Sequence, residues 1–185
     1  MLEIRIHGRG GQGGVVALEM LANAYFKQGQ FVQVFPEFGA ERRGAPVAAF
    51  MRVDSRPVRL RCKIYKPDCI IVLDPVLLNS VNVAEGLKAG GWILINSEKT
   101  AQELNLGRAF NVATVNATAV AIKYGLGSRT SPIVNTAMLG AFCGLPLKLN
   151  LPFVKKSIKE KIKIKTNNNL LAAEEAYRNV KLHTI

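Results

Sequence analysis

A glycine-rich stretch near the amino terminus contains the residues whose types and spacing could bind a ligand. Residues 8–14 read Gly-Arg-Gly-Gly-Gln-Gly-Gly, so Gly8, Gly10 and Gly13 form the spacing Gly-x-Gly-x-x-Gly. Glycine allows a turn to adopt positive φ and lets a ligand approach the bare backbone. A helix directly after such a turn offers unpaired N–H groups and its positive dipole end to an anion. We therefore predict that this turn binds a phosphate or another anion, with a tight packing turn as the alternative.

The segments on either side of this turn have the patterns that such a site needs. Residues 2–7 alternate apolar and polar side chains, which is the period of a strand with one apolar face. Residues 15–26 are apolar at most helical positions, which predicts a largely buried helix. A strand, a glycine turn and a helix in this order form the context in which the glycine spacing is informative.

Two standard nucleotide-binding versions of this turn fit poorly. A Walker loop needs Lys and then Ser or Thr after its last glycine, whereas this chain has Gly14-Val15 there. A dinucleotide fold needs an acid at the end of its second strand to hold a ribose. The predicted second strand, residues 31–35, is followed by Pro36-Glu37, so Glu37 is a poorly placed candidate for that role. The sequence therefore disfavours a nicotinamide or flavin dinucleotide.

A second candidate loop spans residues 36–44 and combines charge with glycine. It includes Arg42, Arg43 and Gly44, and it follows the carboxyl end of a predicted strand. Open α/β sheets place their ligands at such loops. The two arginines could bind phosphate, and a subunit interface is the alternative of nearly equal weight.

Two single residues at strand ends complete the set of candidates. His7 precedes the glycine turn, and Asp74 follows the apolar run 69–73. Each could touch a ligand, although a local hydrogen bond for His7 and an ordinary Asp-Pro turn for Asp74 are the alternatives. No Ser/His/Asp arrangement, His-rich metal set or activated cysteine is present. We therefore predict a binding component with no catalytic residue and no metal ligand of its own.

Length and composition indicate one domain with a full core. The chain has 185 residues, of which 49% are hydrophobic. Its longest nearly unbroken apolar stretch, residues 110–122, is too short and too rich in Asn, Thr and Ala to span a bilayer, and no signal peptide is evident. We predict a soluble, cytoplasmic protein without membrane contact. The three cysteines are too few and too scattered for a disulfide framework, a zinc site or an iron–sulfur cluster.

The net charge of +12 favours an anionic partner or ligand. No basic motif interleaved with aromatic residues and no helix-turn-helix pattern is present, so we expect no nucleic acid. Lysines concentrate in residues 155–165, where apolar residues recur at helical spacing. This pattern predicts an amphipathic helix with a solvated basic face.

Strand and helix patterns alternate along the chain and predict a layered α/β domain. We expect a three-layer, Rossmann-like arrangement with a mixed, mostly parallel sheet in residues 1–150 and a helical tail in 151–185. Further strands are predicted at 46–53, 58–62, 69–73, 92–96 and 109–115, with 58–62 pairing back on 46–53 as a hairpin. Further helices are predicted at 75–88, 117–124, 133–144, 151–164 and 168–180.

Four motifs stand out along the chain when they are taken together. They are His7-Gly8-Arg9-Gly10-Gly11-Gln12-Gly13, residues 35–47 (FPEFGAERRGAPV), Lys66-Pro67-Asp68 before Val72-Leu73-Asp74, and Asn135-Thr136-Ala137-Met138-Leu139-Gly140. In this order they resemble the gamma subunit of 2-oxoacid:ferredoxin oxidoreductases, with pyruvate:ferredoxin oxidoreductase (pyruvate synthase) as the nearest group. The resemblance runs from residue 2 to about 145, and its first two motifs are specific as a pair.

The resemblance implies one subunit of a larger enzyme. Such enzymes decarboxylate a 2-oxoacid on thiamine diphosphate, pass electrons through iron–sulfur clusters to ferredoxin, and transfer the acyl group to coenzyme A. It implies that thiamine and clusters belong to alpha, beta and delta subunits, and that the gamma subunit helps to hold coenzyme A. The implied binding residues are Gly8, Arg9, Gly10, Gly11, Gln12, Gly13, Arg42, Arg43, Gly44 and Asn135. A structural subunit without ligand contact and an NAD- or FAD-binding oxidoreductase remain the alternatives.

Overall fold

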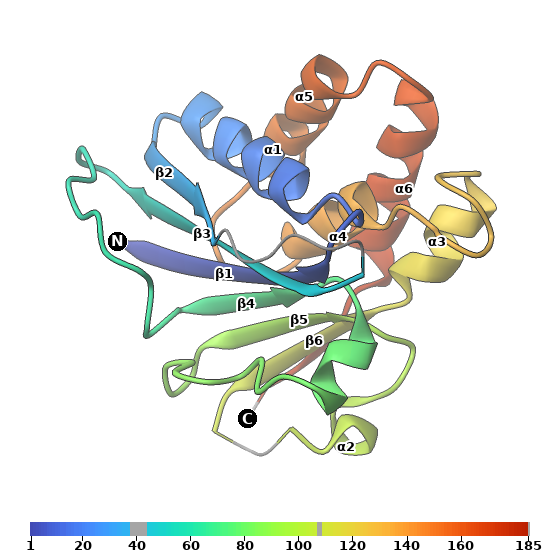
Figure 1. The fold of residues 1–185 in the computed structure, drawn as a ribbon. Helices are drawn as coiled ribbons and strands as arrows, with labels where there is room; N and C mark the ends of the chain where they lie inside the picture. Colours follow the sequence, from blue (N-terminus) through green and yellow to red (C-terminus); the bar gives the residue numbers. More distant parts are fainter. Residues whose placement is uncertain (38–43, 107–108, 185) are drawn as a thin grey trace.

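A mixed sheet of seven strands forms the centre of the computed structural model, which describes residues 1–37, 44–106 and 109–184 (Figure 1). The strands are β1 (Leu2–Arg9), β2 (Phe31–Pro36), β3 (Pro46–Asp54), β4 (Cys69–Val72), β5 (Trp92–Asn96), β6 (Asn111–Val115) and β7 (Lys181–His183). Their order is β2-β3-β1-β4-β5-β6-β7. Strands β1, β4, β5 and β6 are parallel, whereas β3 is antiparallel to β1 and β2, and β7 is antiparallel to β6. The predicted α/β class with a mixed, mostly parallel sheet is confirmed.

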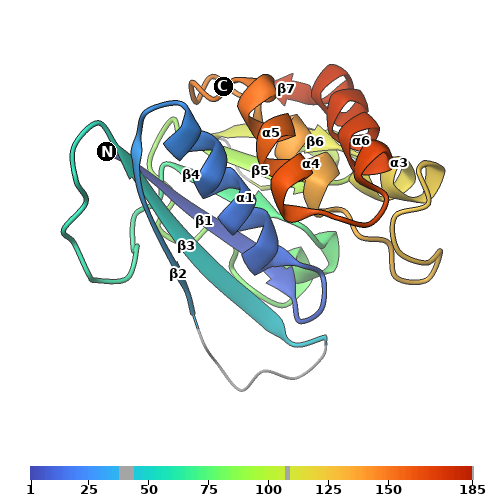
Figure 2. The same cartoon turned by 90° about the horizontal axis from the view of Figure 1, so that it is seen from above.

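The longer helices lie on one face of this sheet (Figures 1 and 2). The helical elements are α1 (Gly14–Lys27), the 3-10 helix η1 (Pro75–Asn79), α2 (Ala101–Leu104), α3 (Ala117–Lys123), α4 (Asn135–Phe142), α5 (Leu151–Lys161) and α6 (Thr166–Asn179). Helices α1, α4, α5 and α6 form the upper layer in Figure 1. Below the sheet lie η1, turns and the short helix α2, so the second covering layer is thinner than the first.

The alternation of side chains along the strands divides the core between the two faces. Ile4 and Ile6 of β1 are fully buried in the larger cluster beneath α1. Ile70 and Val72 of β4 lie in the smaller cluster with Leu77 of η1. Because β4 is covered on both faces, it is apolar throughout, as expected of a central parallel strand.

The predicted hairpin strand at residues 58–62 is wrong. Residues 55–66 form no strand, although Val58, Leu60 and Cys62 alternate with arginines. Strand β3 already pairs with β2 on one edge and with β1 on the other, so no edge is available for a returning strand. The antiparallel component of the sheet comes instead from the insertion of β3 between β2 and β1.

The predicted helix at residues 75–88 is also wrong beyond its first turn. Only η1 is helical, and turns follow it. The Arg5 side chain of β1 donates hydrogen bonds to the carbonyl oxygens of Val83 and Glu85, the former at 3.0 Å. In an α-helix those carbonyl oxygens would accept hydrogen bonds from the helix backbone. Here they accept hydrogen bonds from the buried Arg5 guanidinium instead, and the segment is not helical.

The helices near the carboxyl terminus have bounds that differ slightly from the predicted ones, and the chain then returns to the sheet. Helices α5 and α6 correspond to the predictions at 151–164 and 168–180. Strand β7 was not expected from the sequence, and it pairs with β6 along Val112–Thr114. The predicted helical tail therefore also contributes an edge strand.

Candidate functional site

The glycine turn follows β1 and leads directly into α1, as the sequence predicts. Gly11 and Gly13 adopt φ values of 93° and 75°, a region that side chains disfavour. Gly13 is the residue immediately before α1, and no side chain from the described residues caps that helix. The first N–H groups of α1 therefore remain available to an anion.

A buried aspartate holds the turn in place from the next strand. Asp74 Oδ2 accepts hydrogen bonds from Arg9 Nε at 2.6 Å and from Gln12 Nε2 at 2.8 Å, while Asp74 Oδ1 accepts one from Val76 N at 3.0 Å. Gln12 Oε1 also accepts from Arg9 N at 2.7 Å, which closes the turn on itself. Arg9 and Gln12 thus use polar atoms to shape the loop, and Asp74 has a positioning role.

The electrostatics of Asp74 agree with that role. Its burial alone would raise the pKa of its carboxyl group. The hydrogen bonds from Val76, Gln12 and Arg9 outweigh the burial and hold the pKa of Asp74 below its usual value. The group is therefore a carboxylate at neutral pH, and its charge is satisfied by Arg9.

Asn135 lies beside the glycine turn at the start of a second helix. Its side chain is buried, and a Cβ added to Gly13 would lie 2.9 Å from Asn135 Nδ2. The residue before helix α4, Val134, provides no side-chain cap, but Asn135 Oδ1 accepts a hydrogen bond from Thr136 N in the first turn at 2.8 Å. Two helix N-termini therefore meet at the carboxyl edge of β1, and that of α1 has no side-chain cap among the described residues. The tertiary fold brings together the predicted residues 8–13 and Asn135.

The second predicted loop reaches this turn through its last residue. Gly44 N donates to Gly10 O at 3.2 Å, and Gly10 N donates to Ala45 O at 2.9 Å. Gly44 has φ 87°, which again suits glycine. Arg42 and Arg43 lie outside the described residues, so their predicted role stays a prediction.

Two other residues at this edge serve the framework. The carboxylate of Glu37, the candidate for a ribose contact, forms an ion pair with Lys63. Asn96, which the sequence analysis did not select, donates to Leu73 O at 2.9 Å and accepts from Thr118 N at 3.1 Å. The sequence did contain a signal for Asn96, because it is a polar residue at the end of an apolar strand. The side chain thereby joins the ends of β4 and β5 to α3.

His7 faces away from α1, on the second face of the sheet. Its side chain is nine-tenths buried, and its Nε2 atom has no hydrogen-bond partner among the described residues. Burial, with added repulsion from Arg5 and partial opposition from Glu37, lowers the pKa of His7 to about 4. His7 is therefore neutral at physiological pH and does not supply positive charge to the site.

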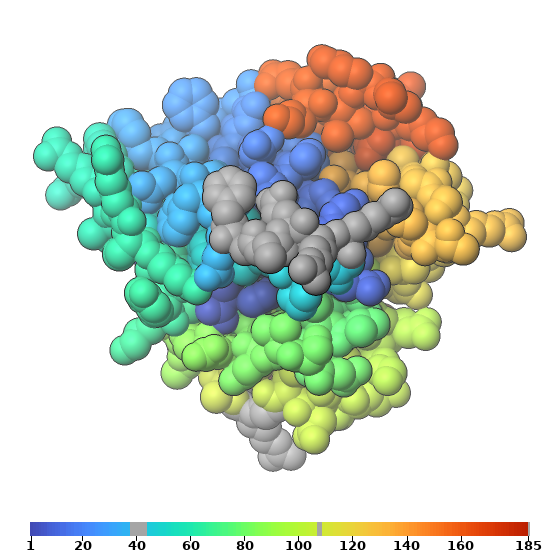
Figure 3. Space-filling view, in the orientation of Figure 1, coloured from blue at the N-terminus to red at the C-terminus, as the bar shows by residue number. Residues whose placement is uncertain are grey.

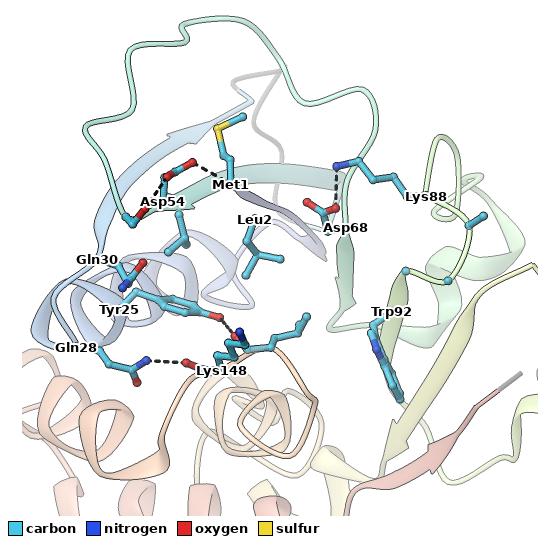
Figure 4. A pocket seen from close by; sticks show the side chains of 16 residues that line it. Met1, Leu2, Tyr25, Gln28, Gln30, Asp54, Asp68, Lys88, Trp92 and Lys148 are labelled. Carbon is cyan, nitrogen blue, oxygen red and sulfur yellow. Dashed lines mark hydrogen bonds and ion pairs between the residues drawn. The ribbon is translucent and has the colours of Figure 1, made fainter.

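A cavity lies at the opposite edge of the sheet, where β1, β4 and β5 begin (Figure 4). Its volume is about 750 Å³, and Tyr25 and Trp92 contribute aromatic walls. Most charged groups around it are paired, since the amino terminus contacts Asp54 at 3.2 Å and Lys88 contacts Asp68 at 2.7 Å, whereas Lys148 has no ion pair with a described residue. This cavity is separate from the glycine turn.

The three cysteines are free thiols and lie in different segments of the chain. Cys69 is buried in β4, Cys143 is partly buried after α4, and Cys62 is exposed. Burial raises the pKa of the Cys69 thiol and raises that of Cys143 to about 12. No group of three or more potential metal ligands occurs in residues 1–37, 44–106 and 109–184. Across the same residues, no helix is both long and apolar enough to cross a membrane.

The sequence of the chain is similar to those of oxoacid oxidoreductase subunits. Residues 3–179 match the family described as Pyruvate ferredoxin/flavodoxin oxidoreductase. The chain is 51% identical to pyruvate synthase subunit PorC of Methanocaldococcus jannaschii, with 96% of each chain covered. It is 47% identical to the pyruvate/ketoisovalerate oxidoreductases common subunit gamma of Thermococcus kodakarensis, again over 96% of each chain.

Solved structures show the same fold. Pyruvate oxidoreductase subunit PORC of Thermotoga maritima has a TM-score of 0.83 and 34% identity, covering 98% of this chain and 97% of that one. A 2-oxoglutarate:ferredoxin oxidoreductase of Magnetococcus marinus, with 2-oxoglutarate, coenzyme A and succinyl-CoA bound, has a TM-score of 0.75 and 19% identity. This chain covers 30% of that longer protein, and the likeness there concerns the fold.

Proposed function

The chain belongs to the pyruvate ferredoxin/flavodoxin oxidoreductase family as a gamma subunit, and from this premise we propose that it helps to bind coenzyme A and to assemble the complex. The observation that carries the proposal is the meeting of two helix N-termini, at Gly13 and Asn135, beside a bare glycine backbone, with the N-terminus of α1 free of a side-chain cap among the described residues. Coenzyme A carries a pyrophosphate and a 3′-phosphate, which are the groups that such N–H donors suit.

The charge of the chain supports an anionic ligand. A net charge of +12 attracts a polyphosphate over a longer range than any single contact. Arg42 and Arg43, directly before Gly44 in the chain, are the proposed charge-assisted donors to phosphate. In this arrangement the gamma subunit fixes the nucleotide end of coenzyme A, so the thiol end can reach the reacting acyl group on another subunit.

We assign the cofactors for decarboxylation and electron transfer to other subunits of the complex. An iron–sulfur cluster needs several thiolates at one place, and Cys62, Cys69 and Cys143 do not provide them. We propose that thiamine diphosphate and the clusters belong to partner subunits corresponding to alpha, beta and delta, with ferredoxin as the electron acceptor. Thiamine diphosphate supplies the decarboxylation chemistry, and this chain supplies binding and orientation.

The fold argues against a dinucleotide cofactor at the turn. In a dinucleotide unit, the strand after the first helix lies beside the first strand and ends in the ribose-binding acid. Here β2 is separated from β1 by β3, and Glu37 is paired with Lys63. The arrangement therefore lacks the acid that would bind the ribose of a dinucleotide. A phosphate-bearing ligand other than a nicotinamide dinucleotide fits the turn better.

A matched pair of glycine variants tests coenzyme A binding. Gly11 and Gly29 have similar φ values, 93° and 87°, and open space where a Cβ would point, but Gly29 lies at the far end of α1. Gly11→Val and Gly29→Val should each cost about 1–2 kcal/mol of stability through backbone strain. In the intact complex, only Gly11→Val should raise the KM for coenzyme A, by about tenfold. Carbon dioxide exchange without an acyl acceptor should persist in both.

The same assay applies to the second loop. Loss of one guanidinium–phosphate contact in Arg42→Ala or Arg43→Ala should raise the KM for coenzyme A about ten- to a hundredfold. If all of these variants keep the wild-type KM in an intact complex, the chain is a structural subunit without ligand contact. If the complex dissociates instead, the loop serves the subunit interface.

A further inference from the structure

The segment between β3 and β4 is a long basic loop that the proposed coenzyme A site does not use. Residues 55–66, called here the basic arm, contain no acidic residue. Figures 1 and 2 show the arm as a teal loop that extends from the end of β3, and Figure 3 shows it at the left rim of the surface. Its basic residues are Arg56, Arg59, Arg61, Lys63 and Lys66.

The arm is anchored to the body of the protein near its carboxyl end. Ile64 is only 1% exposed, so it is a core residue within an otherwise exposed segment. The buried Arg52 of β3 donates to Lys63 O at 3.4 Å, and its guanidinium also contacts Cys62. The backbone of Tyr65 packs against Gly86 with no room for a Cβ there. These contacts hold residues 62–65 of the arm in place before any partner binds, which lowers the entropy cost of docking there.

The positive charges of the arm lack counter-ions within the part of the chain that the structure describes. Arg56, Arg59, Arg61 and Lys66 form no ion pair with a described residue, and Lys63 alone has one, with Glu37. The acids that flank the arm pair with other cations: Asp54 binds the amino terminus, while its Oδ1 accepts from Arg56 N at 3.2 Å, and Asp68 binds Lys88.

The arm also offers apolar side chains and an open backbone. Leu60 is 47% exposed and Tyr65 is 71% exposed. The backbone of residues 55–66 makes no hydrogen bond to the backbone of another described residue. A loop of this length without secondary structure is uncommon and usually has a function. Cations interleaved with a tyrosine and a leucine suit a protein surface, since protein interfaces are enriched in Tyr and Arg.

We propose that the basic arm docks a carboxylate-rich segment of another subunit of the oxidoreductase. The arm's arginines pair with the partner's carboxylates, and Tyr65 and Leu60 become covered. Complementary charge of this kind sets the orientation and the rate of association. This inference rests on the assembly role in the proposed function and is independent of coenzyme A.

A charge-reversal experiment on the complex tests the arm. The variant Arg59→Glu/Arg61→Glu is compared with Lys156→Glu/Lys159→Glu, which makes the same change in charge on exposed positions of α5. Sedimentation of the co-expressed complex at several salt concentrations gives the fraction of this chain that is assembled. The arm variant should weaken association about tenfold or more, whereas the α5 variant should change it less than twofold.

Several results would overturn the proposal. One is an arm variant that assembles like the wild type at every salt concentration, and another is an equal loss in both variants. Retention of nucleic acid that depends on the arm while assembly does not would assign the arm to a nucleic acid instead. If the wild-type chain fails to co-purify with other subunits, the proposed function itself fails.

A measurement on the unmodified protein covers the case in which the reversed variant does not fold. A zero-length carbodiimide reagent joins amines to carboxylates in direct contact, and Lys66 is the exposed, unpaired lysine of the arm. In the wild-type complex, Lys66 should cross-link to an Asp or Glu of another subunit. Cross-links from Lys66 only to carboxylates of its own chain, in a complex that remains assembled, would contradict the docking.

Discussion

Individual polar residues at the carboxyl edge of the sheet mainly shape the site. Asp74 gathers Arg9, Gln12 and Val76 N around one carboxylate, so the glycine turn has a single geometry. Backbone N–H groups and the exposed end of the Arg9 guanidinium remain as donors there. His7 shows the opposite case, because its buried Nε2 has no partner among the described residues.

We expect His7 to make stability depend on pH. The unfolded chain binds a proton at this histidine below about pH 6.5, whereas the native chain does so only near pH 4. Because the unfolded state then holds more protons, the free energy of unfolding falls as the pH drops through this window. Between pH 6.5 and pH 5 the loss attributable to His7 should approach about 2 kcal/mol.

Urea unfolding of wild type and His7→Phe at pH 7, 6 and 5 measures this effect. Phenylalanine fills a similar volume and cannot be protonated, so the stability of the variant should fall less over this range. Parallel stability curves for the two proteins would show that His7 is not held neutral by the fold.

At the scale of elements, close contact between helices fixes where α4 begins. A Cβ at Gly140 would collide with the backbone of Ala173 in α6, whereas a Cβ at Gly144 would meet chiefly the Val180 side chain. A side chain can move aside more easily than a helix backbone can. The α4–α6 contact therefore sets the position of Asn135 relative to the glycine turn.

Gly140→Ala should consequently separate the two helices. We expect a loss of about 3 kcal/mol in unfolding free energy, or roughly 6–12 °C in Tm. Gly144→Ala is the control and should cost clearly less, since its obstacle is a side chain and Gly144 has no positive φ. Thermal unfolding by circular dichroism compares them, and equal losses would mean that backbone contact at Gly140 is not limiting.

The whole molecule separates its surfaces around one sheet. The glycine turn lies at the carboxyl edge, the 750 Å³ cavity at the amino edge, and the basic arm beyond β3. Cys62, Cys69 and Cys143 belong to three different parts of this architecture. Such a distribution provides binding surfaces without a common thiolate site.

The purified chain should therefore be colourless, whereas the assembled oxidoreductase should show the visible absorption of iron–sulfur clusters. Reconstitution of the isolated chain with iron and sulfide, followed by desalting, makes the comparison quantitative, with the complex as the positive control. Cluster absorption that stays with this chain after desalting would require a thiolate arrangement different from the one described.

The sequence by itself determined the local units and the family. The strand, glycine turn and helix at residues 2–27 follow from side-chain periodicity and glycine spacing, which act over neighbouring residues. The continuous apolar runs at 69–72 and 92–96 identified central strands, because both of their faces are buried. Two specific motifs were enough to indicate the gamma-subunit family, which the comparisons confirm.

Only the tertiary structure decided how these units meet. Periodicity reports which face of a strand is buried, but it does not report which strand edge is free. For that reason the sequence could not predict that β3 enters between β2 and β1, that residues 58–62 stay unpaired, or that β7 joins β6. Asn135 reaches Gly13, and Asp74 reaches Arg9, through packing of elements far apart in the chain. The site arises from these long-range contacts, which no local pattern encodes.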